Sequence, residues 1–76
     1  MTITRNMTVE VAKEGKTIVV EVYDHLDMVD SFRTWDGKGI ARHVDHMLHD
    51  RGYQRTGSWQ TLTKDLMTFK VDHYGE

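Results

Sequence analysis

The first 23 residues contain two segments of alternating apolar and polar side chains, and this pattern constrains the fold more than any other feature of the sequence. A period of two residues is typical of β-strands with one buried face. The polar, glycine-containing stretch at 13–16 separates the two segments and has the length of a hairpin turn. We therefore expect a β-hairpin. Its core-facing side chains would be Ile3, Met7, Val9, Val11, Ile18, Val20 and Val22.

Residues 37–51 carry apolar side chains at the spacing of an amphipathic helix. The stripe runs through i, i+4, i+7 and i+8, so its members would share one face of the helix. We expect Thr34 or Asp36 to cap the N-terminus of this helix. The stripe consists of Ile40, Val44, Met47 and Leu48.

The glycine after this segment predicts where the helix ends. Gly52 stands where a left-handed residue commonly terminates a helix. Tyr53 would then pack back on Leu48, as the Schellman type of helix ending requires.

The last third of the chain predicts a second hairpin. Residues 53–62 are expected to be extended, with a bulge or kink at Gly57 and Ser58, and the chain would turn at 63–65. The order is then ββαββ in a single domain, residues 1–76. We expect an α+β fold in which one amphipathic helix packs on one face of an antiparallel four-stranded sheet.

Residues 24–36 fit no regular period, so we expect an irregular loop with at most a short strand around Phe32. Connections of this length are often functional. Apolar and aromatic side chains within an acidic surround are typical of a protein-docking surface. The alternative is that these side chains close the open end of a small core. The candidate partner-binding residues are Asp24, Asp27, Met28, Asp30, Phe32 and Trp35.

The sheet face away from the helix is a second candidate surface. Val19 and Tyr23 have the opposite parity to the core-facing residues of their strand, so they would point away from the helix. A sheet covered on one face only leaves the other for water or a partner. This face could pair two copies as a homodimer or receive another protein.

Nucleic-acid binding is an alternative function, based on cationic and aromatic side chains around the second hairpin. The net charge of −2 argues against a partner held mainly through phosphates. The segment from Leu48 to Ser58 resembles the helix-to-strand junction of small mRNA-interferase toxins with a double-stranded-RNA-binding-like fold. That family has a histidine where this chain has Trp59, and its fold does not start with a hairpin, so no activity is carried over. The basic candidates are Arg51, Arg55, Lys64 and Lys70.

Metal binding is a second alternative. His43, His46 and Asp50 lie at i, i+3 and i+7, along one flank of the predicted helix. Such side chains can bind zinc, but a structural zinc site normally needs four ligands and no fourth is evident from the sequence. We therefore expect no metal and no other cofactor.

Composition narrows the function class. A chain of 76 residues leaves little interior for a water-excluding catalytic cleft, so we expect no enzymatic activity. It has no cysteine, which favours a cytoplasmic setting, and no apolar run long enough to span a membrane. The sequence therefore predicts a small protein-interaction module or regulator, of the kind found among phage accessory proteins, whose partner is another protein or a second copy.

Overall fold

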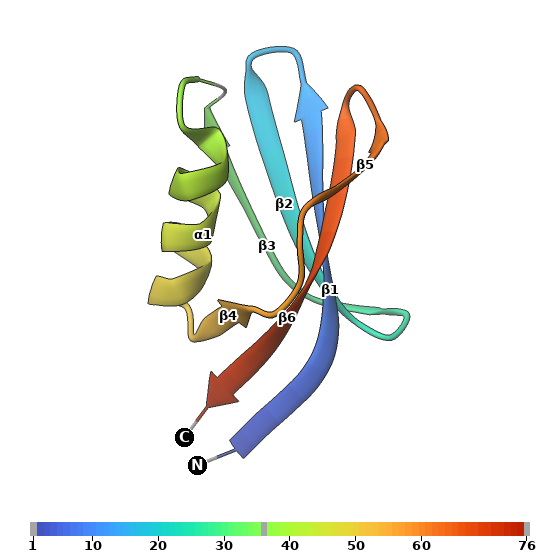
Figure 1. Ribbon diagram of the computed structural model, residues 1–76, viewed down its shortest axis with the longest axis vertical. Coiled ribbons are helices and arrows are strands. Elements are labelled where there is room, and N and C mark those ends of the chain that lie inside the picture. Colours follow the sequence, from blue (N-terminus) through green and yellow to red (C-terminus); the bar gives the residue numbers. More distant parts are fainter. Residues whose placement is uncertain (1, 36, 76) are drawn as a thin grey trace.

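The computed structural model describes residues 2–35 and 37–75, which form one antiparallel sheet with one helix packed against it (Figure 1). This confirms the α+β class with a single helix, but the described chain has six strands where four were expected. The sheet order is β3-β2-β1-β6-β4, and β5 also pairs with β6. The elements are β1 (Thr2–Glu14), β2 (Thr17–Asp24), β3 (Asp27–Trp35), α1 (Ile40–Asp50), β4 (Tyr53–Arg55), β5 (Gln60–Thr63) and β6 (Leu66–Gly75).

The predicted first hairpin is confirmed, and β1 also pairs with β6 at the other side. Gly15 occupies the turn with a φ of 64°, a left-handed conformation that glycine adopts without strain. One expectation fails at the start of β1. The register shifts between Thr4 and Met7, and this bulge puts Ile3 on the opposite face from Met7.

The predicted irregular loop at 24–36 is wrong over most of its length. Residues 27–35 form β3, which pairs with β2 through a tight turn at His25 and Leu26. The register shifts by one residue between Val22 and Tyr23, so an extra residue of β3 interrupts its alternation. This bulge is the reason that the apolar residues of the segment show no period of two.

The helix is confirmed, although it begins at Ile40, three residues later than expected. The N-cap position is Gly39, with a φ of 73° and no side-chain cap. Thr34 is therefore not the cap, because it belongs to β3; Asp36 lies outside the described residues. The predicted left-handed residue is present at Gly52, whose φ is 89° and whose amide donates to the His49 carbonyl at 3.0 Å, the inner of the two hydrogen bonds of a Schellman ending.

The second hairpin is interrupted where a bulge was expected. β4 pairs with the C-terminal half of β6 and β5 with its N-terminal half, and residues 56–59 between them belong to neither strand. Two short strands therefore form this edge of the sheet, whereas β3 forms the other edge as one strand of nine residues.

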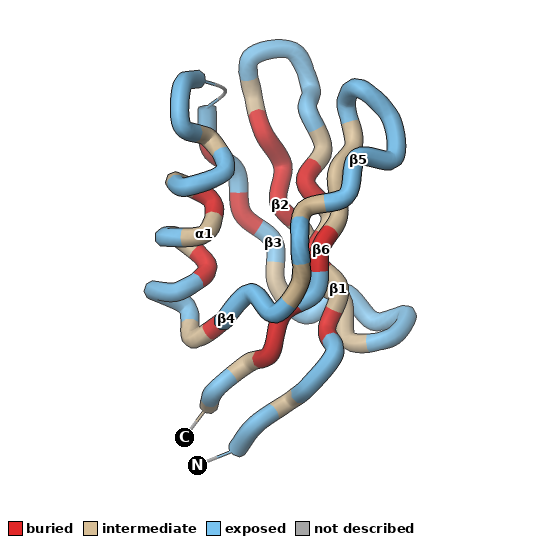
Figure 2. Tube along the Cα trace, in the orientation of Figure 1, coloured by how far each residue is buried: buried red, intermediate tan, exposed pale blue. Residues whose placement is uncertain are grey.

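The core lies between α1 and the sheet face toward it (Figure 2). Val44 and Leu48 from α1 are buried against the alternating residues of the central strands, as the sequence predicts. No helix in the described part of the chain is long and apolar enough to cross a membrane. The buried cluster consists of Met7, Val9, Val11, Ile18, Val20, Val22, Phe32, Val44, Leu48, Tyr53, Phe69 and Val71.

Candidate interaction surface

Exposed apolar side chains gather on β3 and on the turn that precedes it. Seven large apolar residues are exposed in the described chain, and four of them belong to this one segment. Exposed apolar side chains mark interaction sites when they lie together. Here three of them lie together at the N-terminal end of β3 and in its turn, and the fourth lies at the C-terminal end of the strand. The four are Leu26 (95% exposed), Met28 (54%), Val29 (51%) and Trp35 (68%).

The backbone of β3 adds to this surface because β3 is the last strand of the sheet order. An edge strand presents backbone N–H and C=O groups on its outer side, and these groups can pair with another strand. The opposite edge is divided between β4 and β5, which offers only short runs of such groups. The β3 edge, defined here as residues 26–35, is therefore the longer surface open to strand addition.

Asp30 organises the middle of the β3 edge. Its carboxylate accepts hydrogen bonds from the Ser31 amide at 2.8 Å, from the Arg51 guanidinium at 2.9 Å and from the Tyr53 hydroxyl at 3.4 Å. Asp30 thus ties β3 to the end of α1 and to β4, and it also occupies one backbone amide of the edge. Asp30 was predicted to bind a partner, but its carboxylate is engaged inside the molecule.

Phe32 belongs to the core. It is only 8% exposed, and the guanidinium of Arg51 lies 4.5 Å from the centre of its ring. A cation over an aromatic face is an attractive contact. The alternative interpretation of the segment therefore holds for Phe32, which closes the core at the β3 edge.

Trp35, in contrast, leaves most of its surface exposed at the C-terminal end of β3. Its ring lies 4.8 Å from that of His43, whose Nε2 shares a hydrogen bond of 3.0 Å with the Thr34 hydroxyl. These contacts orient the indole without burying it. Lys38 lines the same small hollow as Trp35 and His43, so a lysine lies beside the indole.

The N-terminal end of the β3 edge is acidic. Asp24 and Asp27 are directly paired across the β2–β3 turn, with the exposed Leu26 between them. His25 lies 3.9 Å from the Asp24 carboxylate. Among the described residues, neither Asp27 nor Arg33 at the other end forms an ion pair.

The second predicted surface, the sheet face away from α1, is more polar than expected. Val19 lies on this face but is only 9% exposed, so it offers little apolar surface. Glu10 and Glu21 are directly opposite each other there. Burial raises the pKa of the neighbouring Tyr23 hydroxyl, and the charges of Glu21 and Glu10 raise it further. Tyr23 lines an open hollow of about 320 Å³ together with Thr8, Glu10, His25 and Leu26.

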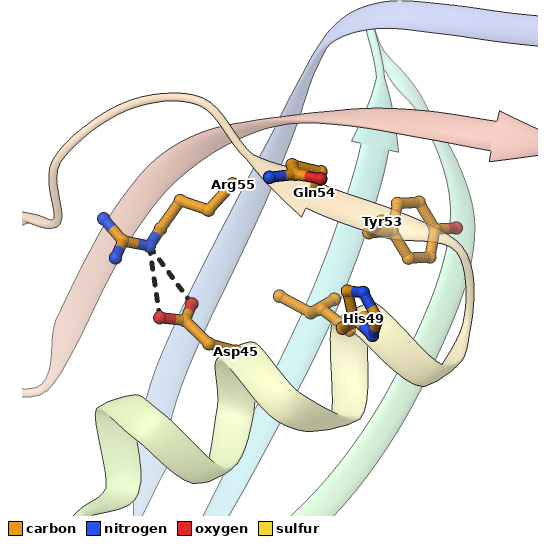
Figure 3. Close-up of a pocket in the computed structure, with 6 residues that line it drawn as sticks. Asp45, His49, Tyr53, Gln54 and Arg55 are labelled. Atoms are coloured by element: carbon orange, nitrogen blue, oxygen red, sulfur yellow. Dashed lines mark hydrogen bonds and ion pairs between the residues drawn. The ribbon is translucent and has the colours of Figure 1, made fainter.

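The four basic candidates for nucleic-acid binding do not form one surface. Arg51 is paired with Asp30, and Arg55 is paired with Asp45 of α1 at 3.2 Å on the helix side of the sheet (Figure 3). Lys70 donates to the Thr8 hydroxyl on the opposite face, and Lys64 lies in the β5–β6 turn. Two of the four charges are therefore neutralised internally. Nearby, Trp59 packs against Phe69, with a distance of 4.5 Å between the ring centres.

The histidine flank of α1 is only partly assembled. His46 and Asp50 are 3.6 Å apart, but His43 is directed to Thr34 on β3. Within residues 2–35 and 37–75, no group of three or more histidine or carboxylate side chains is arranged to hold a metal ion. Comparisons with protein-family models, with curated proteins and with solved structures found no match for this chain.

Sequence reasoning counted Leu26 and Val29 among the apolar side chains of the segment but did not single them out as binding residues, and it did not consider Arg33 as one. Leu26 lies in a two-residue turn that was not recognised, and Val29 sits at the bulge. The signal that could have found Arg33 is that it is the one base among the acids of residues 21–36.

Proposed function

We propose that this protein is a non-catalytic interaction module that binds another protein chain along the β3 edge. The observation that carries the proposal is that Leu26, Met28, Val29 and Trp35 are exposed on one edge strand and the turn that precedes it. Strand addition to a sheet edge gains affinity from main-chain hydrogen bonds and specificity from alternate side chains. The lack of cysteine suits action in a reducing, cytoplasmic setting.

The division of roles along β3 supports binding at its edge. Phe32 and Thr34 are buried and hold the strand against the core, while Met28, Ser31, Arg33 and Trp35 are exposed. A strand anchored through one face and open along its edge can accept a partner without unfolding. The side chains that stabilise the fold are therefore different from those available to a partner.

The test is capture of a partner from native cell lysate by the tagged chain, after nuclease treatment. Met28→Ser and Trp35→Ser each remove one exposed apolar side chain from the β3 edge. Leu62→Ser is the matched control, because Leu62 is 56% exposed on β5 at the opposite edge. We expect a stoichiometric protein with the wild type and Leu62→Ser, and roughly tenfold weaker capture with the two β3 variants.

Circular dichroism should show the same secondary structure for all four proteins. Capture that is unchanged by both β3 substitutions, or that is lost only with Leu62→Ser, contradicts the proposal. A retained species that disappears on nuclease treatment would instead favour nucleic-acid binding.

A further inference from the structure

The β3 edge is charged with opposite sign at its two ends. The N-terminal end carries Asp27, with Asp24 of β2 paired beside it, and the C-terminal end carries Arg33, with Lys38 beside Trp35. The strand between Asp27 and Trp35 is about 27 Å long at the usual rise of about 3.4 Å per residue. The Debye length at physiological salt is about 8 Å, so the two ends do not neutralise each other through solvent.

We infer that the chain bound along the β3 edge is a second copy of this protein, paired β3 to β3 in antiparallel orientation. This inference rests on the proposed function and names its partner. In an antiparallel pair related by a two-fold axis, Asp27 of each copy lies near Arg33 of the other. A parallel pair would place like charges together at both ends, which is unfavourable.

The apolar side chains are complementary in the same orientation. Leu26, Met28 and Val29 lie at one end of the edge and Trp35 at the other, so antiparallel pairing brings aliphatic side chains of one copy toward the indole of the second. A pairing centred on Ser31 places Arg33 opposite Val29 of the second copy. Asp27 of that copy is then the diagonal neighbour, within reach of a long arginine side chain.

Asp30 makes this association reversible. The Ser31 amide is bonded to the Asp30 carboxylate in the single chain, so strand pairing exchanges that bond for one to a carbonyl of the second copy. Asp30 keeps Arg51 and Tyr53 as partners throughout. Two edge strands bury less surface than a standard interface, so the dimer dissociates on dilution.

The experiment is sedimentation equilibrium over a concentration series, combined with charge reversal. Asp27→Arg places two bases together at each end of the dimer, and Arg33→Asp places two acids together. We expect each variant alone to dimerise roughly tenfold more weakly than the wild type. An equimolar mixture of the two recovers dimerisation, because every altered residue then faces the opposite charge on the other chain.

Lys64→Asp is the matched control, since it changes the net charge as Arg33→Asp does but lies in the β5–β6 turn. It should dimerise as the wild type does. A wild type that stays monomeric at every concentration overturns the inference, and so does a mixture that fails to recover. A monomeric wild type that still captures a different protein through Met28 and Trp35 leaves the proposed function standing and refutes only self-association.

Discussion

At the residue scale, Gly52 shows how one backbone conformation joins the helix to the sheet. Its φ of 89° ends α1, and its carbonyl accepts a hydrogen bond of 2.8 Å from the Tyr74 amide of β6. A Cβ at this position would lie 3.0 Å from the Tyr74 carbonyl oxygen and 3.2 Å from Nε2 of His73. Both the conformation and the close approach of β6 therefore require glycine.

Gly15 provides the comparison for a prediction at Gly52. It has a φ of 64°, but a Cβ there would meet nothing within 4 Å. Gly15→Ala should cost about 1–2 kcal/mol of unfolding free energy from the left-handed conformation alone. Gly52→Ala should cost a further 1–3 kcal/mol, roughly, because a backbone carbonyl must move. Urea denaturation measures both; equal losses would show that the contact with β6 does not matter.

At the scale of the element, β3 contains both a buried residue that stabilises the fold and an exposed residue that contributes little to stability. Phe32 and Trp35 are both aromatic residues of β3, yet one is buried beneath Arg51 and the other is mostly exposed beside His43. We expect Phe32→Ala to lower the free energy of unfolding by about 3–5 kcal/mol, a large part of the stability of a small domain. Trp35→Ala should cost less than about 1 kcal/mol. Thermal melting followed by circular dichroism compares the two, and similar melting temperatures would contradict the burial of Phe32.

At the scale of the whole molecule, Tyr53 connects four elements. It follows α1 and begins β4, its hydroxyl donates to Asp30 of β3, and its ring lies 4.6 Å from that of His73 on β6. Burial raises the pKa of the Tyr53 hydroxyl, and the charge of Asp30 and the hydrogen bond to it raise the pKa further, against a lowering by Arg51. The folded state therefore holds this proton more tightly than the unfolded state does.

The raised pKa of Tyr53 predicts how stability depends on pH. Above the unfolded pKa of about 10, the unfolded state releases the proton first, so the folded protein loses stability as pH rises through that range. Tyr53→Phe should reduce this alkaline loss while costing no more than about 1 kcal/mol at neutral pH, because it removes one long hydrogen bond. Urea denaturation between pH 7 and pH 11, roughly the range spanning this titration, measures the effect. An identical alkaline loss in the variant would show that Tyr53 does not contribute; Tyr23 would then be the group to replace, since the pKa of its hydroxyl is also raised.

Local patterns in the sequence were sufficient to predict the strands and the helix whose side-chain pattern is contained in a short segment. The alternation of Val9, Val11, Val20 and Val22 predicts the first hairpin, and the stripe through Val44 and Leu48 predicts the helix. Gly52 predicts the end of the helix because a left-handed residue is a local requirement. These predictions succeeded because backbone geometry and side-chain periodicity are properties of short segments.

The tertiary structure alone decided the features that depend on distant partners. The bulge at Val29 hides the alternation of β3, and only its register with β2 shows that Phe32 is core and Trp35 is surface. In the sequence, Asp30 looks like an ordinary surface acid. Only the packing of α1 brings Arg51 and Tyr53, which lie more than twenty residues away in the sequence, to its carboxylate. The sheet order, which makes β3 an edge, results from β1 pairing with β6 across the length of the chain. Such pairings minimise the free energy of the whole core, so no short segment contains the information that specifies them.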